Sequence, residues 1–231
     1  MRAFTSLSAF FALLFTAGSG VAQVNDGQWV SYRDAYRAMV AFEKYGKSKH
    51  FIQNHFQVMP QDKNLAPEGL QLSLQGKGTS VNLPLDATGR TVFPLLKSAY
   101  DENAALVLNR KVSQYVFRPR ISIVVRADGV YETGDLRSAC EEALAYQRTV
   151  DATLRALRCT GVRFVFARGM VDPGVRVRKG EGEALTTQDG PAFPGDPYEG
   201  FRVVTYRFSA AGEKSHVVTQ NAPLAINPIY E

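Results

Sequence analysis

The sequence predicts an α+β fold: a largely antiparallel β-sheet or sandwich, an amino-terminal helix, and one long helix or helical hairpin around residues 135–158. Three observations predict it. Short segments of alternating apolar and polar residues fill the region from residue 56 to residue 131. Two stretches with helical spacing of apolar residues flank that region. More alternating segments follow the second stretch, and this order favours α+β over a pure sandwich.

The chain begins with a segment typical of a cleavable signal peptide, residues 1–22. Arg2 supplies a positive charge, an apolar run follows over residues 9–17, and Gly20–Ala22 provides small residues before a cleavage site. The run is too short to cross a bilayer, which takes about 20 residues. We expect a mature protein that starts near Gln23, is periplasmic or secreted, and has no membrane span after cleavage.

The mature chain, residues 23–231, has a length suited to a single globular domain. The full sequence has 27 Lys and Arg against 22 Asp and Glu, a formal net charge of +5. This mild excess lacks the concentrated positive charge of nucleic-acid-binding domains, so we expect no nucleic-acid partner.

The first helix is expected over residues 28–46. Ser31 is placed to accept a hydrogen bond from a first-turn amide, and Gly46 is a natural stop. Its apolar stripe is formed by Ala35, Met39 and Phe42.

Seven strands are expected next. Leu70–Leu74 shows the pattern best, because its leucines alternate with polar residues. The others are Phe56–Met59, Val81–Leu83, Thr91–Phe93, Ala105–Leu108, Tyr115–Phe117 and Ile121–Val125.

The segment from Leu83 to Pro94 contains a turn signal. Asp86 can bond its own backbone two residues on, and Gly89 can adopt positive φ, so we expect a hairpin. These twelve residues resemble a hairpin of the transthyretin-like and carboxypeptidase-regulatory-like sandwiches. The resemblance implies a sandwich-type fold and no residue roles.

The strongest helical pattern covers residues 134–158, with Asp135 as the expected N-cap. A straight helix would separate Cys140 and Cys159 by about 28 Å, too far for a disulfide. An exported protein nevertheless usually pairs its two cysteines. A break near Thr149-Val150, with Thr149 or Asp151 capping a second helix, reconciles the two, and we favour the disulfide. The seam residues are Leu136, Cys140, Ala143, Gln147, Val150, Leu154 and Leu157.

Strands are expected again at Val162–Ala167, Phe201–Phe208 and His216–Thr219. Between them, residues 171–200 are rich in Pro, Gly and polar side chains, and we expect a long flexible loop there. Residues 221–231, which contain two prolines, are expected to form an extended tail.

Familiar catalytic signatures are missing, including the nucleophile elbow, the zinc-protease helix, the phosphate loop and the dinucleotide fingerprint. We therefore expect no cofactor. The only histidines are His50, His55 and His216. A metal site would need a loop that gathers His50 and His55 with Asp62 or His216, and we do not expect one.

Five arginines alternate along the expected strands and form a candidate anion-binding patch if their polar faces coincide. The alternative is an ordinary charged face of a half-buried sheet. The five are Arg118, Arg120, Arg163, Arg202 and Arg207.

These features favour a non-enzymatic exported binding module, or an envelope-associated one, whose partner is an unidentified protein or envelope component. Two alternatives stay open. One is an exported hydrolase with a dispersed site around the histidines and nearby acids. The other is an assembly or chaperone-like factor that offers a sheet edge to another chain.

Overall fold

The computed structural model describes residues 29–65, 67–178, 182–209 and 214–231. The predicted signal peptide, residues 1–22, lies outside the described residues. The fold is α+β with antiparallel sheets, which confirms the predicted class. In the described part, no helix is both long enough and apolar enough to span a membrane.

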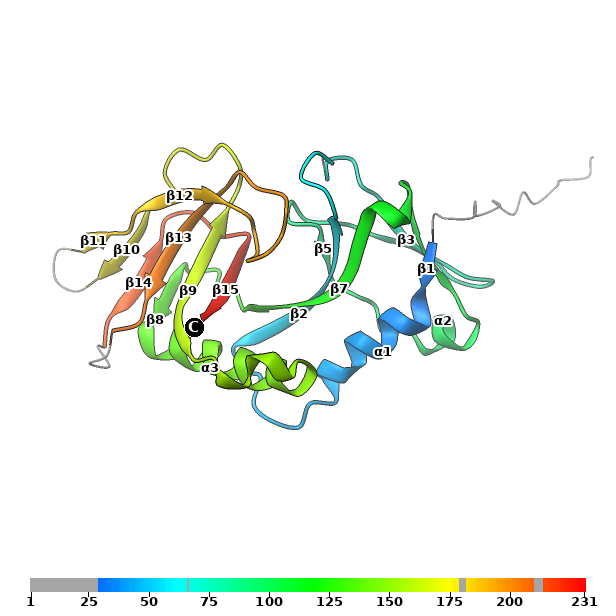
Figure 1. The fold of residues 1–231 in the computed structure, drawn as a ribbon, viewed down its shortest axis with the longest axis horizontal. Coiled ribbons are helices and arrows are strands. Elements are labelled where there is room, and N and C mark those ends of the chain that lie inside the picture. The colour runs from blue at the N-terminus through cyan, green and yellow to red at the C-terminus, as the bar shows by residue number, and fades with distance from the viewer. Residues whose placement is uncertain (1–28, 66, 179–181, 210–213) are drawn as a thin grey trace, which may run out of the picture.

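A seven-stranded antiparallel sheet forms the centre of the molecule (Figure 1). Its long strands β2 and β7 pair over nine residues and run between the two ends of the molecule. In spatial order the strands are β12 (Thr187–Gly190), β13 (Phe201–Arg207), β9 (Cys159–Phe166), β15 (Ala225–Tyr230), β7 (Tyr115–Ile123), β2 (Ile52–Pro60) and β5 (Arg90–Thr91).

Two four-stranded sheets lie at opposite ends of this central sheet (Figure 1). The first has the order β1 (Trp29–Ser31), β6 (Ala105–Leu108), β3 (Leu72–Gln75) and β4 (Ser80–Leu83). The second has the order β11 (Glu183–Ala184), β10 (Val175–Arg178), β14 (His216–Thr219) and β8 (Val130–Glu132).

The two longer helices lie along the same side of the molecule, below the central sheet in Figure 1. The α-helices are α1 (Tyr32–Glu43), α2 (Lys97–Asp101) and α3 (Thr133–Val150). Two short 3₁₀ helices, η1 (Val112–Gln114) and η2 (Ala152–Ala156), complete the described helical elements.

The register of the central sheet separates its two faces. Side chains of directly opposed residues share a face, and neighbours along a strand alternate. Ile123, Ile226 and Phe164 are therefore on one face, because Ile226 is opposed to both of the others. We call it the packed face, since α3 and the second small sheet pack there, and the first small sheet packs on its other end, at Phe56.

The opposite face of the central sheet, which we call the open face, is more polar. Asn227 is opposed to Arg163, and Gln57 to Arg118, so all four are on this face. Its apolar part is small and is packed by residues 192–193 of the segment between β12 and β13. That cluster contains Val165, Ala192, Phe193, Phe201, Val203 and Ala225.

The Ser31 cap of α1 follows the prediction, but the helix begins only at Tyr32, because residues 29–31 form β1 and not helix as expected. The Ser31 side chain accepts a hydrogen bond from the amide of Asp34 at 3.3 Å. The predicted stripe of Ala35, Met39 and Phe42 is buried, together with Tyr32. The helix ends at Glu43, before the predicted stop at Gly46.

The second helical region breaks near Thr149-Val150, as a disulfide between Cys140 and Cys159 requires. Helix α3 ends at Val150, and the Asp151 carboxylate then accepts a hydrogen bond from the Thr153 amide to start η2. This turn returns Cys159 to Cys140; the two form a disulfide with Cα atoms 5.9 Å apart. Two details were wrong: Glu132 takes the N-cap position expected for Asp135, and Val150 is exposed.

The turn after Leu83 forms as predicted, but the hairpin does not. The Asp86 carboxylate accepts hydrogen bonds from the amides of Thr88 and Arg90, and Gly89 has φ of +75°. A Cβ on Gly89 would lie 2.2 Å from the Val58 carbonyl oxygen, so only glycine fits. The flanking strands β4 and β5 belong to different sheets, because the turn passes from the first small sheet to the central one.

The expectation of an irregular loop over residues 171–200 was wrong. The segment contains β10, β11 and β12, and it buries Ala192, Phe193 and Asp196. Val175 and Val177 alternate with Arg176 and Arg178 in β10, a period-two pattern hidden among prolines and glycines.

The expectation of an extended tail over residues 221–231 was also wrong. Its residues Ala225–Tyr230 form β15, which is inserted between β9 and β7 in the central sheet. Ala225 and Ile226 have no exposed surface. Pro228 is tolerated because β15 pairs with β7 only at Ile226, so the strand beyond that point borders β9 alone.

Candidate functional site

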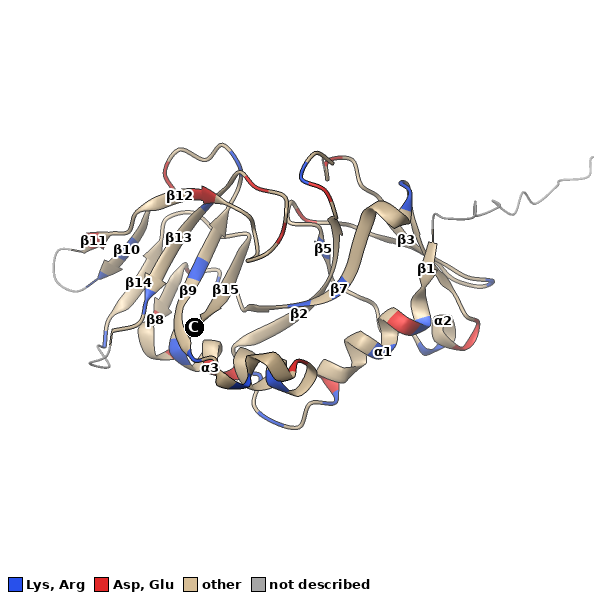
Figure 2. Ribbon diagram, viewed as in Figure 1, with Lys and Arg blue, Asp and Glu red and all other residues tan. Residues whose placement is uncertain are grey.

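The five arginines of the predicted anion-binding patch are placed on two faces of the central sheet. Arg118, Arg120, Arg163 and Arg207 are on the open face, whereas Arg202 is opposed to Phe166 of the packed face. Figure 2 shows that Lys and Arg are spread over the molecule and do not gather on one element. The structure therefore brings together only part of the set.

Arg118 and Arg120 come together on β7 around one buried carboxylate. Their Nη2 atoms donate to Oδ1 of Asp196 at 2.6 and 2.8 Å, and Asp196 is 4% exposed in its side chain. The other Asp196 oxygen accepts a hydrogen bond from Gln57. Asp196 thereby anchors the segment between β12 and β13 on the open face.

A third guanidinium, missed by the sequence analysis, adjoins this pair. Arg90 on β5 is buried and donates to the Asp86 carboxylate at 2.8 Å and to the Ser122 hydroxyl. The guanidinium carbons of Arg90 and Arg120 lie 5.4 and 4.4 Å from the centroid of the Phe193 ring. The signal for Arg90 was available, because it follows the Asp86 turn directly.

The other three arginines of the patch are separate. Arg202 pairs with Asp189, and Arg207 pairs with Glu231. Arg163 has no ion pair within the described residues, and its Nε atom is buried without a hydrogen-bond partner there. Its Nη2 stands 2.5 Å from where a Cβ of Gly190 would be, so the guanidinium occupies space that glycine leaves open.

The three histidines lie apart from one another. His50 is exposed in the turn before β2, His55 is half-buried on the open face, and His216 is exposed at the start of β14. Within residues 29–65, 67–178, 182–209 and 214–231, no group of three or more His, Cys, Asp or Glu residues is arranged to hold a metal ion.

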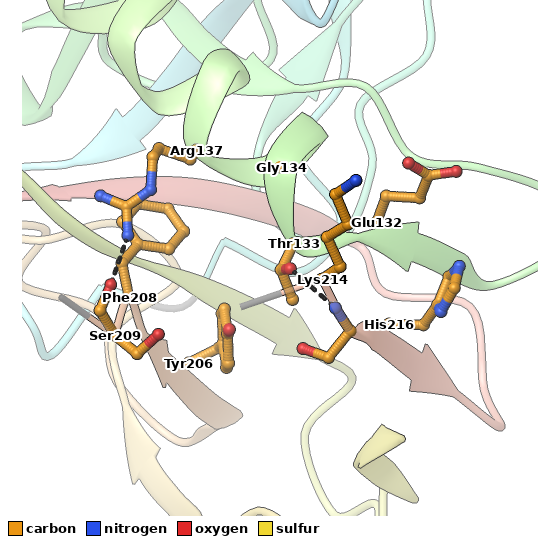
Figure 3. Close-up of a pocket in the computed structure, with 10 residues that line it drawn as sticks. Glu132, Thr133, Gly134, Arg137, Tyr206, Phe208, Ser209, Lys214 and His216 are labelled. Atoms are coloured by element: carbon orange, nitrogen blue, oxygen red, sulfur yellow. Dashed lines mark hydrogen bonds between the residues drawn. The ribbon is translucent and has the colours of Figure 1, made fainter. Parts of the chain in front are cut away.

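A cavity of about 540 Å³ lies where α3 begins (Figure 3). Among the described residues, three segments form it: the end of β8 with the first turn of α3, the end of β13 with Phe208 and Ser209, and the start of β14 with the two residues before it. The described lining residues are Glu132, Thr133, Gly134, Arg137, Tyr206, Phe208, Ser209, Lys214, Ser215 and His216.

Two cationic side chains and one carboxylate, that of Glu132, line this cavity. Figure 3 shows Arg137 on one side and Lys214 on the other, with Thr133 and Gly134 between them. The amides of the first turn of α3 have no acceptors within the helix, and they carry the positive end of the helix dipole. Glu132 at the N-cap position makes no capping hydrogen bond with its side chain.

Local contacts hold these groups in place. The Arg137 guanidinium lies 4.6 Å from the centroid of the Phe208 ring and donates to the Ser209 carbonyl oxygen at 2.8 Å. The Thr133 hydroxyl accepts a hydrogen bond from the Ser215 amide, and the Thr133 amide donates to the Ser215 carbonyl oxygen. The start of α3 is thus fixed to the start of β14.

Ser215, in the cavity wall, carries a buried hydroxyl without a partner among the described residues. Ser215 is 5% exposed, and its Oγ has no hydrogen-bond partner among the described residues. Leaving a buried hydroxyl unpaired costs about 1–3 kcal/mol. Ser215, which carries this unpaired hydroxyl, lines a cavity that also has two cationic side chains in its wall.

The sequence analysis did not identify this cavity. Arg137 and Lys214 stand 77 positions apart, and neither belongs to a recognisable motif. Only the pairing of β14 with β8, which leads directly into α3, brings them to the same place.

Comparisons with known proteins do not place the chain in a family. No family model matches it, and neither the curated proteins nor the solved structures contain a match.

Proposed function

We propose that the protein is an exported, non-enzymatic binding module that receives a small carboxylate-bearing ligand in the cavity at the start of α3. One observation carries the proposal. The positive end of a helix dipole, two cationic side chains and a serine with a buried, unpaired hydroxyl converge on one cavity.

The polar groups fit a carboxylate. Helix starts bind anions because their amides point at the ligand and the dipole favours negative charge. Arg137 offers a planar fork of donors that matches the two oxygens of a carboxylate, and Lys214 adds a point charge. The Ser215 hydroxyl, which is unpaired in the free protein, donates one further hydrogen bond to the bound ligand.

The rest of the cavity fits an apolar body. Tyr206 and Phe208 contribute aromatic surface to the lining. A volume of about 540 Å³ falls within the range of roughly 300–1,000 Å³ that small-ligand pockets occupy. We therefore expect aromatic or branched carboxylates to bind more tightly than acetate.

Export rests on the predicted signal peptide and is supported by the disulfide. The Cys140–Cys159 bond is consistent with an oxidising compartment. The partner is then a ligand or component of the cell envelope or its surroundings. The mass of the exported product tests the expected start near Gln23.

Isothermal titration of the mature protein with benzoate, and with its neutral analogue benzamide, tests the proposed function. We expect benzoate to bind and benzamide to bind at least tenfold more weakly, a difference of about 1.4 kcal/mol. Arg137→Gln should abolish this preference. Arg37→Gln, which changes an exposed arginine of α1, should leave it intact. Equal affinity of the wild type for both ligands would refute a carboxylate site.

A second pair of variants isolates the hydroxyl. Ser215→Ala should weaken benzoate binding about tenfold, because a hydrogen bond to a charged group is lost. Its free energy of unfolding should stay equal or rise, since an unpaired buried hydroxyl disappears. Ser138→Ala, on the exposed side of α3, should change neither quantity.

A further inference from the structure

The arginine cluster of the open face has an uneven charge balance. Three guanidinium groups, those of Arg90, Arg118 and Arg120, adjoin two carboxylates, those of Asp86 and Asp196. One positive charge is therefore uncompensated within the cluster. Its location is partly buried, since the side chains of Arg90, Arg118 and Arg120 are 4%, 36% and 17% exposed.

The surplus charge belongs to Arg118 and Arg120. Arg90 has its own carboxylate, that of Asp86, whereas Arg118 and Arg120 share a single oxygen of Asp196. Burial, together with the charges of Arg118 and Arg90, lowers the pKa of Arg120 to about 10, although Asp196 acts against this shift. A further anion beside the pair would relieve that repulsion.

Donor atoms are left over for such an anion. Arg118 and Arg120 use Nε and Nη2 in hydrogen bonds to Gln57, Met59 and Asp196. Their Nη1 atoms have no partner among the residues that the structure describes, and they are not among its buried unpaired nitrogens. Two adjacent guanidinium groups thus keep one accessible donor each.

We propose that Arg118 and Arg120 form a second binding site, separate from the α3 cavity, for a phosphate group. Paired guanidinium forks suit the several oxygens of a phosphate. Asp196 acts as a positioning residue, because it fixes both forks at the same oxygen and leaves Nη1 of each available. The phosphate is either free in solution or part of a lipid headgroup.

Titration of the mature protein with inorganic phosphate and with vesicles of phosphatidylglycerol in phosphatidylcholine separates these two sources. Binding of inorganic phosphate assigns a small ligand. Binding only to the phosphatidylglycerol vesicles assigns a headgroup. Either result supports the site if Arg118→Gln lowers the affinity for the probe about tenfold. The control is Arg207→Gln, which changes an exposed arginine of the same face and should leave the affinity unchanged. Absence of binding to both probes, or equal losses in the two variants, would overturn the proposal.

Asp196→Asn supplies an independent test, because Asn keeps the shape of the side chain and removes its negative charge. Where thermal unfolding shows that this variant is folded, its phosphate affinity should exceed that of the wild type. A variant that is folded and binds phosphate more weakly would contradict the charge balance described here. If the variant does not fold, Arg118→Gln decides alone, since Arg118 is the most exposed of the three arginines. Neither variant should alter benzoate binding at the α3 cavity, so failure of one site is distinguishable from failure of the other.

Discussion

At the scale of single residues, buried polar groups without partners mark the places where this protein differs from a simple packed core. Most buried polar atoms in proteins are hydrogen-bonded, so each exception calls for a reason. The Ser215 hydroxyl is one such exception, and we propose that the ligand of the α3 cavity is its partner. The Nδ1 atom of His55 is a second exception, on the open face of the central sheet.

His55 makes a pH-dependent contribution to stability. Burial and then the charge of Arg90 lower the pKa of His55 below its usual 6.5, and Asp86 opposes part of this shift. The unfolded chain therefore takes up the proton more readily. The stability that the neutral imidazole contributes is present above pH 6.5 and is lost as the pH falls from there through the folded-state pKa.

Two measurements check this prediction. The titration midpoint of His55, followed by proton NMR in the folded protein, should lie below 6.5. The free energy of unfolding should fall less between about pH 7 and about pH 5 in His55→Gln than in the wild type. A midpoint at or above 6.5 would show that the environment of His55 is not the one described here.

At the scale of elements, the disulfide fixes the connection between α3 and β9. Cys140 and Cys159 close a loop of 19 residues and are both buried. The chain-entropy model assigns such a loop about 3 kcal/mol. Replacing both cysteines with serine should lower the free energy of unfolding by about 2–4 kcal/mol, measured in urea. Non-reducing peptide mapping should join the two cysteine peptides, whereas two free thiols in the oxidised protein would contradict the structure.

The elements also show what sequence periodicity can and cannot predict. Ala105–Leu108 and His216–Thr219 have the bounds expected, because their alternation and flanking turns are clear. Strand β15 escaped detection because it packs inside the central sheet. Its run of Ala225-Ile226-Asn227-Pro228 buries all four residues and does not alternate. The proline content suggested a tail, but all six residues of β15 pair with β9.

Strand β7 shows that a break in the alternation of apolar and polar residues does not always end a strand. One strand was expected before Arg118, Pro119 and Arg120 and another after them. The structure joins the two into a single strand. The polar interruption that divided them in the sequence is the segment that holds Asp196. A local break in the pattern therefore marked the place where the segment between β12 and β13 is anchored on the sheet.

At the scale of the whole molecule, the α3 cavity depends on chain topology. The lining residues that the structure describes are 132–134 with 137, 206 with 208–209, and 214–216, and no local pattern connects these three groups. The fold class was predictable because it follows from the order of helical and alternating segments. The cavity was not, because it requires knowing that β14 pairs with β8 at the start of a helix.

The central claim is that this cavity binds a carboxylate, and an NMR titration of isotope-labelled mature protein with benzoate tests it most directly. The account predicts saturable changes in amide chemical shift concentrated at Gly134, Asp135 and Ser215, with much smaller changes around Arg118 and Arg120. Titration with benzamide should leave these three amides nearly unshifted, since the neutral ligand lacks the charge that the helix start and Arg137 attract. Shifts spread over other surfaces, or none at the start of α3, would contradict the account.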